Sequence, residues 1–354
     1  MLAYVGSYTT ARRQARGNGI NLYRVEDGSG AWTHLQQLGG LVNPSYLALD
    51  HKGRFLYAVH GDLDEISAFA VERGSGRLGF VNRRSAGGVN PVHLAIDATD
   101  RFIVTANYAN GAVSVVPIAE DGSLGSGIRT LALPGAPGPH RAEQTGSHPH
   151  HCPFDPSGRF VLVPDKGLDR TFVLRLDADK GELVPNDPPH VEARAGAAPR
   201  HIACHPSLPY AYVINELDST ITSYSWDTAR GTLRPFQVVP SLPDRFTGNN
   251  TGAEIAVASS GAVLYVSNRG HDSIGTFAIE RASGRLSAVG WTSTEGNKPR
   301  FFCLDPSGTR LYAANEASDT IVAFRIEPAS GKLAATGQVV QSASPACIVF
   351  RDEP

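Results

Sequence analysis

Residues 299–315, PRFFCLDPSGTRLYAAN, contain the pattern that decides the fold. The segment has an apolar run after a proline, a turn around Asp-Pro-Ser-Gly, and a second apolar run that ends in asparagine. Five other segments share this pattern: PSYLALDHKGRFLYAVH (44–60), PVHLAIDATDRFIVTAN (91–107), PHHCPFDPSGRFVLVPD (149–165), PRHIACHPSLPYAYVIN (199–215) and GAEIAVASSGAVLYVSN (252–268). Alternating runs of this length, separated by turn residues, predict pairs of antiparallel strands.

A recurring turn of the Gly-x-Leu type gives the length of the repeat. Its seven glycines lie 46 to 59 residues apart, at Gly30, Gly76, Gly122, Gly181, Gly231, Gly284 and Gly331. A third alternating run, such as ISAFAV (66–71) or IVAFRI (321–326), precedes the turn, and a more polar run follows it. Four short strands per unit, in four to eight units of this length, are typical of a β-propeller.

The two ends of the chain together supply the seventh unit. PACIVF (345–350) matches a first strand, LAYVGSY (2–8) a second strand and GINLYRV (19–25) a third strand. We therefore predict an all-β, seven-bladed propeller with four antiparallel strands per blade, in which both termini close the last blade and leave no free edge blade. Residues 1–354 then form a single domain, although the length alone suggests about two.

The composition argues against several classes of function. The chain has 32 Lys and Arg against 34 Asp and Glu, so no basic excess favours nucleic acid or an anionic membrane surface. No apolar run is long enough for a transmembrane helix, and no signal peptide is visible. The four cysteines, which form no CxxC pair, are Cys152, Cys204, Cys303 and Cys347. We expect a cytoplasmic protein with reduced thiols. The sequence does not define its oligomeric state.

Equivalent positions of the repeats can be compared because the first two strands align without gaps. The first strand of a propeller blade lines the central channel, so the residues at its start surround one mouth. At these positions, and at the position just after the second strand, other units hold small residues such as Ser45, Gly61 and Ala253. Side chains that depart from this, in the third to sixth units, are His150, Arg200, Glu216, Glu254, Arg269 and Arg300. A ring scaffold does not require charge there, and we predict that these residues form a site for a small anion.

Four neighbouring residues are further candidates for substrate binding. His151 and His201 occupy the next position of the first strand, and Asn215 and Asn268 end the second strand. The last position is polar in all six full units, which also has a structural explanation because Asn and Asp often cap loops.

The long loop PGAPGPHRAEQTGSHPHH (134–151) contains four histidines, which raises the question of a metal. They are His140, His148, His150 and His151. Zinc needs three or four ligands in a defined geometry, and Pro149 prevents helical pairing of the last two. We favour a loop that orients one catalytic or binding histidine, and we predict no metal and no other cofactor. The sequence has no GxGxxG, Walker A or GxSxG motif, and Cys152 is interpreted as a buried structural thiol.

The whole chain resembles the seven-bladed propeller lactonase family, which includes propeller-type 6-phosphogluconolactonases and the fungal carboxy-cis,cis-muconate cyclase. The resemblance is carried by the repeat pattern and by LAYVGSYT (2–9), DPSGRFVLVPDKGLDR (155–170), NELDSTI (215–221) and SNRGHDSI (267–274). It implies an active site of His150, Arg200, Glu216 and Arg269. In this interpretation His150 or Glu216 is the general base, and the arginines bind an anionic substrate and stabilise developing charge.

The resemblance implies a metal-independent lactone hydrolase whose expected substrate is 6-phosphogluconolactone, an intermediate of the pentose phosphate pathway. Two alternatives remain open at this point. The protein could be a cycloisomerase, or a lactonase for another sugar or aromatic acid. It could also be a propeller that binds other proteins without catalysis, in which case the four residues would lie more than about 15 Å apart, too far for one small substrate.

Overall fold

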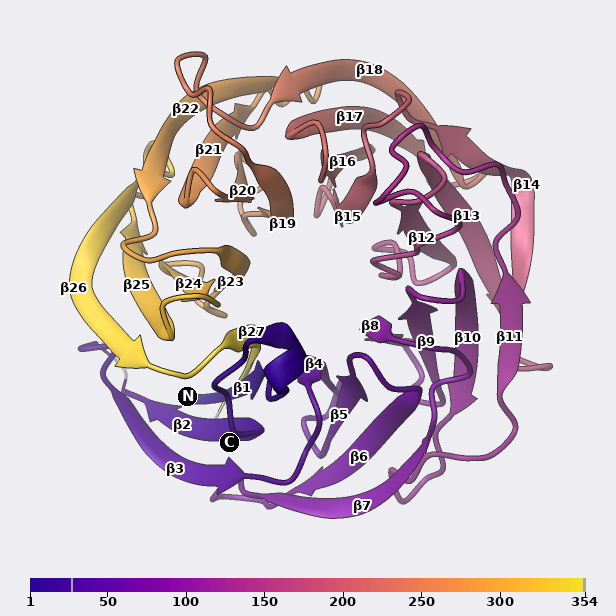
Figure 1. Cartoon of the computed structure of the whole chain (residues 1–354), viewed down its shortest axis with the longest axis vertical. Helices are drawn as coiled ribbons and strands as arrows, with labels where there is room; N and C mark the ends of the chain where they lie inside the picture. Colours follow the sequence, from indigo (N-terminus) through magenta and orange to yellow (C-terminus); the bar gives the residue numbers. More distant parts are fainter. Residues whose placement is uncertain (27, 353–354) are drawn as a thin grey trace.

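The computed structural model describes residues 1–26 and 28–352 as seven antiparallel sheets arranged in a ring (Figure 1). The prediction of a seven-bladed propeller is confirmed. Five blades are consecutive four-stranded meanders. They comprise β4 (Pro44–Leu49), β5 (Phe55–His60), β6 (Glu65–Val71) and β7 (Leu78–Ser85); β8 (Pro91–Ile96), β9 (Phe102–Asn107), β10 (Ala112–Pro117) and β11 (Arg129–Ala132); β15 (Pro199–Cys204), β16 (Tyr210–Asn215), β17 (Thr220–Asp227) and β18 (Thr232–Pro240); β19 (Thr251–Val257), β20 (Val263–Arg269), β21 (Ser273–Ile279) and β22 (Leu286–Ser293); and β23 (Pro299–Leu304), β24 (Arg310–Asn315), β25 (Thr320–Ile326) and β26 (Leu333–Gln341).

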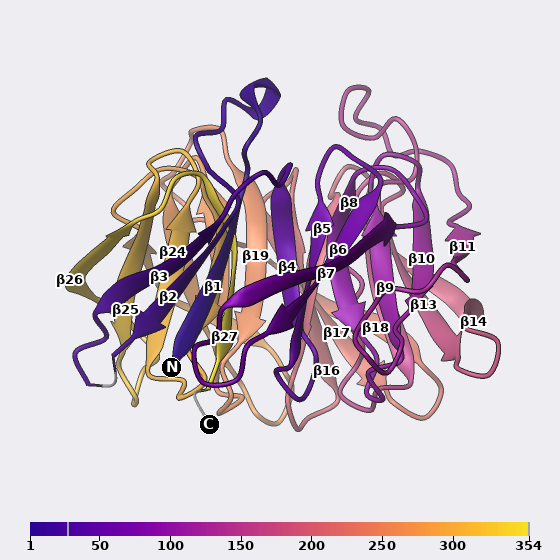
Figure 2. The same ribbon diagram turned by 90° about the horizontal axis from the view of Figure 1, so that it is seen from below.

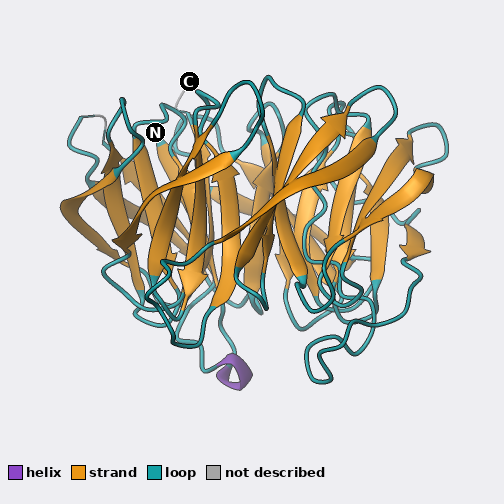
Figure 3. Ribbon diagram, turned by 90° about the horizontal axis from the view of Figure 1, so that it is seen from above, coloured by secondary structure: helices purple, strands orange, loops and turns teal. Residues whose placement is uncertain are grey.

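The termini close the ring as the sequence predicts. The last blade has the order β27 (Pro345–Arg351), β1 (Leu2–Ser7), β2 (Ile20–Val25) and β3 (Trp32–Leu38). A 3-10 turn, η1 (Ala11–Arg13), lies between β1 and β2 and projects from the end of the ring opposite both termini (Figures 2 and 3).

The third blade differs from the others in its inner strand. Its regular strands are β12 (Phe160–Asp165), β13 (Arg170–Asp177) and β14 (Glu182–Glu192). The segment 149–154 takes the inner place but forms only isolated bridges, Pro149 with Asp165 and Phe154 with Val161. Pro153 and Pro164 explain the interruption, because a proline donates no hydrogen bond to a strand ladder. The chain between these bridges is thus freer to point His150 and His151 in different directions.

Contacts between neighbouring blades explain why the turn glycines recur. The hydroxyl of Tyr57 in β5 donates to the carbonyl of Gly122 in the next blade at 3.0 Å, and Tyr212 donates to Gly284 at 2.9 Å. Tyr4 and Tyr265 make the equivalent bonds to Gly76 and Gly331. These glycines have positive φ, between 69° and 80°, which other residues adopt at a cost. The repeat therefore records an inter-blade hydrogen bond as well as a turn.

A local irregularity at the start of the inner strands shapes the mouth of the channel. In five blades the register shifts across the residue after the proline, which is Ser45, Val92, Arg200, Arg300 or Ala346. Such bulges turn a side chain away from the regular pleat. The residue before the proline has positive φ in the same blades, for example 59° at Ala198. These two features place one re-aimed side chain per blade at the mouth.

Candidate active site

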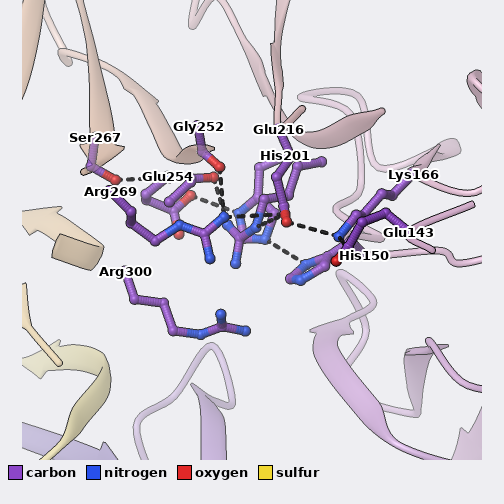
Figure 4. A network of polar contacts seen from close by, with 12 residues as sticks. Glu143, His150, Lys166, His201, Glu216, Gly252, Glu254, Ser267, Arg269 and Arg300 are labelled. Atoms are coloured by element: carbon purple, nitrogen blue, oxygen red, sulfur yellow. Dashed lines mark hydrogen bonds and ion pairs between the residues drawn. The ribbon is translucent and has the colours of Figure 1, made fainter. Parts of the chain in front are cut away.

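Glu216 lies at the centre of a charged cluster at this mouth. Its backbone N–H donates to the carbonyl of Ala198 at 2.8 Å, which holds the end of β16 beside the start of β15. Its Oε1 accepts from Lys166 Nζ at 2.8 Å, and its Oε2 lies 3.1 Å from Arg200 Nε and 3.2 Å from Arg269 Nη2. Three blades thus contribute cations to one carboxylate (Figure 4).

These cations keep Glu216 ionised. Burial alone would raise the pKa of the Glu216 carboxyl, but Arg269, Lys166 and Arg200 outweigh burial and hold it well below its usual range. Burial, with repulsion from Arg269, lowers the pKa of Arg200 to about 9, so Arg200 is still charged at neutral pH. Arg200 is 2% exposed and also donates to the carbonyl of Ala253 at 2.5 Å. Glu216 and Arg200 are therefore a fixed ion pair in which Arg200 lies behind Glu216.

A cavity of about 180 Å³ opens in front of this cluster. Its lining residues are Arg13, Asn90, Val92, Tyr108, His150, Lys166, Glu216, Arg269 and Arg300. Arg13 forms a two-point ion pair with Asp62, both contacts at 2.6 Å, and Lys166 is also bound by Glu143 at 2.7 Å. The lining thus carries more positive than negative charge, which suits a small anion.

Arg300 faces this cavity with its guanidinium less engaged than that of Arg200. Its nearest carboxylate among the described residues is Glu316, at 3.9 Å, and its guanidinium carbon lies 5.3 Å from the centre of the Tyr8 ring. Figure 4 shows the side chain reaching toward the cluster of Glu216 without a contact to it. Burial alone would lower the pKa of Arg300, but Tyr8, Glu316 and Glu216 raise it above its usual value. Arg300 is therefore a charged group that contacts Tyr8 and is held by no short ion pair among the described residues, so it can bind an anion in the cavity.

His150 is a neutral base at the edge of the cavity. Burial lowers its pKa well below the usual 6.5, and Arg200, His201, Arg300 and Lys166 add to this effect by repulsion. Its Nδ1 lies 3.2 Å from His201 Nε2, so its other nitrogen, Nε2, is left for the cavity. A neutral imidazole within reach of a water can act as a general base.

A layer of buried rings lies beneath the mouth. His151 stacks on His201 with ring centres 4.2 Å apart, and His93 meets His151 edge to face at 4.0 Å. His201 Nδ1 is 2.8 Å from Glu254 Oε1. Burial raises the pKa of Glu254, and His151 and Arg200 oppose this rise. His93 and His151 also line a larger, mainly apolar hollow of about 590 Å³ below the layer. The layer separates this hollow from the charged cavity.

The arrangement at the mouth combines three chemical capacities. His150 can accept a proton from water. Arg269 and Lys166 can stabilise a negative oxygen that forms beside it, because fixed cations in a partly dry site act strongly on developing charge. Arg300 can hold an anionic group of the substrate through its guanidinium. These capacities are those needed to hydrolyse an activated ester of an anionic molecule.

Comparison with known proteins identifies the family. The model of the family described as "Lactonase, 7-bladed beta-propeller" matches residues 2–350. The chain belongs to this family. The chain is 36% identical over 307 residues to the 6-phosphogluconolactonase of Bacillus subtilis strain 168, covering 86% of this chain and 85% of that one. It is 30% identical to the 6-phosphogluconolactonase of Formosa agariphila, with 86% of each chain covered. The solved periplasmic gluconolactonase of Pseudomonas aeruginosa is 28% identical, with a TM-score of 0.91 and all of both chains covered. The enzyme class expected from the sequence, a lactonase, is confirmed.

The structure brings the four residues that the family resemblance implied to one place in this lactonase. His150, Glu216 and Arg269 line the cavity, and Arg200 lies directly behind Glu216. The ion-pair distances of 3.1 and 3.2 Å do not agree with the wide separation expected of a non-catalytic platform. Arg300, chosen from its repeat position alone, lines the same cavity.

Several residues expected to bind substrate lie elsewhere. Asn215 and Asn268 are buried within their blades, where Asn215 donates to Thr220 and Thr222, and Asn268 donates to the carbonyl of Ser241. These hydrogen bonds tie Asn215 to the next strand and Asn268 to the segment after β18, and neither residue lines the cavity. His151, His201 and Glu254 lie in the buried layer rather than in the wall of the cavity. The pleat explains this difference, because adjacent residues of an inner strand point to different sides.

Five lining residues were not predicted from the sequence: Arg13, Asn90, Val92, Tyr108 and Lys166. Lys166 and Tyr108 occupy the same repeat position as Glu216 and Arg269, and this shared position was the available signal. Arg13 lies on η1, which has no counterpart in the other blades, so the repeat could not reveal it.

The histidines of the long loop point to separate partners. His148 stacks on Tyr108, His140 accepts the N–H of Glu143, and His150 faces the cavity. Among residues 1–26 and 28–352 no group of three His, Cys, Asp or Glu side chains is placed to hold a metal ion. No helix in that part of the chain is long and apolar enough to cross a membrane.

Proposed function

We propose that this lactonase hydrolyses 6-phosphogluconolactone to 6-phosphogluconate. The observation that carries the proposal is the pair formed by His150 and Arg300, which face one small cavity, one as a neutral base and the other as a cation whose carboxylate partner, Glu316, is 3.9 Å away. Relatives named 6-phosphogluconolactonase at 30% and 36% identity support the substrate. Phosphate carries close to two negative charges at neutral pH, which suits the positive lining of the cavity.

In the proposed reaction, Nε2 of His150 takes a proton from a water molecule, and the water oxygen bonds to the lactone carbonyl carbon. The carbonyl oxygen becomes an oxyanion that Arg269 and Lys166 stabilise. The ring C–O bond then breaks, and the ring oxygen takes the proton back from Nε2 as it becomes a hydroxyl group. The product acid loses a proton to solvent. Arg300 binds the phosphate through these steps.

Glu216 acts in this scheme as an anchor for cations and not as the base. A carboxylate already bound to three cations holds a proton poorly, and its lowered pKa agrees with that role. Glu216 instead holds Lys166, Arg200 and Arg269 at fixed positions despite their mutual repulsion. Of the two candidates for the base that the sequence left open, the geometry favours His150.

Lactone decay measured against the spontaneous background tests the proposal. The purified protein is expected to accelerate hydrolysis of 6-phosphogluconolactone, and His150→Asn is expected to lower kcat by about 10²–10⁴-fold. Folding of the variant is checked by circular dichroism. Decay no faster than in buffer would reject the activity, and a fully active His150→Asn protein would reject the base.

The unphosphorylated gluconolactone is a second candidate substrate. The observation in its favour is the close structural match to the periplasmic gluconolactonase of Pseudomonas aeruginosa. The two substrates differ by the phosphate that Arg300 would bind, so kcat/KM for both lactones separates them. We also propose a cytoplasmic location, supported by the free thiols of all four cysteines.

A further inference from the structure

Three side chains from three consecutive blades form a chain of contacts that ends at the cavity. Glu254 Oε1 lies 2.8 Å from His201 Nδ1, and His201 Nε2 lies 3.2 Å from His150 Nδ1. All three residues are buried, with 3% to 6% of their surface exposed. Figure 4 shows His201 between the other two, with His150 on the side of Lys166.

The backbone next to Glu254 defines where the protons of this chain reside. The N–H of Ile255 donates to Glu254 Oε1 at 3.1 Å, so this oxygen acts as an acceptor. His201 then donates from Nδ1, and its Nε2 carries a lone pair. His150 in turn donates from Nδ1, which leaves a lone pair on the Nε2 that faces the cavity. Each contact thus determines the tautomer of the next ring.

The repeat gives no structural reason for this series of contacts from Glu254 through His201 to His150. The positions that correspond to Glu254 hold His93, His151 and His201 in the three preceding blades and Tyr46, Phe301 and Cys347 in the others, and none of these residues is a carboxylate. A buried carboxylate is costly unless it is paired, and Glu254 Oε2 has no hydrogen-bond partner among the described residues. The presence of a carboxylate at this buried position indicates that Glu254 does more than stabilise the ring of blades.

We propose that His201 and Glu254 are positioning residues that hold His150 in the tautomer needed to accept a proton from water. When Nε2 takes that proton, His150 becomes positive, and the negative charge of Glu254 stabilises it through the intervening ring. This inference rests on the proposed function, in which His150 is the base. It extends the site from the cavity wall into the buried layer and assigns a function to two residues that do not touch the substrate.

Charged groups around His150 set the direction of the pH test. His201, Arg200, Arg300 and Lys166 face His150, together with Glu216 and Arg269 across the cavity and the ring of Tyr108. Glu254 in turn faces His151, Arg200, Arg300 and His201. Most groups near His150 are positive and disfavour its protonated form, so removal of the Glu254 charge is expected to make protonation still harder.

Glu254→Gln removes the charge and retains the shape. Because Oε1 accepts two N–H groups, the oxygen of Gln is expected to take its place and the tautomer to persist. We expect kcat to fall about 10–100-fold, KM to change less than about threefold, and the acid limb of kcat/KM to move to lower pH. Unchanged kcat and an unmoved acid limb in a folded variant would overturn the proposal.

His201→Phe removes the acceptor for His150 Nδ1, and His93→Phe is its matched control. His93 occupies the same repeat position, is equally buried at 3%, and does not contact His150. We expect His201→Phe to lose about 10²–10⁴-fold in kcat and His93→Phe to stay within about threefold of the parent. Equal losses in the two variants would show a packing effect and overturn the inference.

Nitrogen-15 NMR of the histidines tests the tautomer without substrate. We expect His150 in the parent protein to carry its proton on Nδ1, and this preference to weaken in His201→Phe. A proton on Nε2 of His150 in the parent would overturn the inference, whatever the activity. A correct tautomer in a protein without lactonase activity would instead reject the proposed function alone.

Discussion

Replacement of Arg300 by Gln tests whether the cavity recognises a phosphate. Arg300 has no carboxylate closer than Glu316 at 3.9 Å, so the change breaks no short ion pair inside the protein. The substitution should therefore weaken substrate binding more than it lowers the stability of the fold. A hydrogen bond to a charged group contributes about 1.5–3 kcal/mol. At about 1.4 kcal/mol per factor of ten, we expect KM for 6-phosphogluconolactone to rise about 10–150-fold.

The assay compares two lactones that differ only in the phosphate. Initial rates, corrected for spontaneous opening, give kcat and KM for 6-phosphogluconolactone and for gluconolactone. Arg300→Gln should raise KM for the first and change KM for the second less than about threefold. Arg83→Gln is the control, because Arg83 pairs with Glu65 on the outer side of its blade and lies outside the cavity. Equal losses for both lactones would refute phosphate recognition by Arg300.

Three further outcomes are expected. The acid limb of kcat/KM should lie below pH 6.5, because burial and nearby cations lower the pKa of His150 and the base is lost only as pH falls through that value; a limb above pH 6.5 contradicts this. Glu216→Gln should lower the free energy of unfolding by about 3–5 kcal/mol in urea titrations at pH 7, because Arg200, Arg269 and Lys166 lose a carboxylate that they share and Arg200 is buried. The Glu216 pKa is depressed in the folded state, so this contribution is complete above about pH 4.5 and should disappear only as pH falls well below it. Asp305→Ala should cost about 1–3 kcal/mol and leave KM unchanged, because Asp305 accepts the N–H groups of Thr309 and Arg310 in a turn remote from the cavity.

The fold could be predicted from the sequence because each repeat records contacts that every blade needs. Asp305 and its equivalent Asp50 each accept two backbone N–H groups in the turn between the first two strands. The tyrosine bond to the next glycine links neighbouring blades, as between Tyr57 and Gly122. Each of these contacts recurs in four blades, and the residues that make it recur with it. The interrupted inner strand of the third blade was not predicted. Its sequence still matches the repeat, and Pro153 and Pro164 change only the hydrogen bonds that the strand can form.

The site could be predicted only in part, because it consists of departures from the repeat. A charged residue at a channel position was a usable signal, and it pointed to Arg200, Glu216 and Arg300. The signal did not distinguish a side chain in the cavity from one beneath it, so Glu254 and His201 were assigned to substrate binding. For Arg200 and His201 that distinction depends on the bulge that turns the first residue and leaves the second in the regular pleat. In the fifth blade the irregularity spans both Ala253 and Glu254, so the repeat position alone does not give the direction of either side chain.

The closing strand β1 has a consequence for how the protein responds to its ligand. It leads directly to Tyr8, whose ring lies 4.4 Å from the guanidinium of Arg13 and 5.3 Å from that of Arg300. The segment that joins the two ends of the chain is thus also part of the cavity wall. Fraying at either terminus would release Arg13 and Arg300 from their common support. Binding of an anion and the pairing of β1 with β27 are therefore thermodynamically linked, and an anion in the cavity should slow amide exchange in β1 and β27 more than in β4–β7, the strands of a blade that contributes no lining residue.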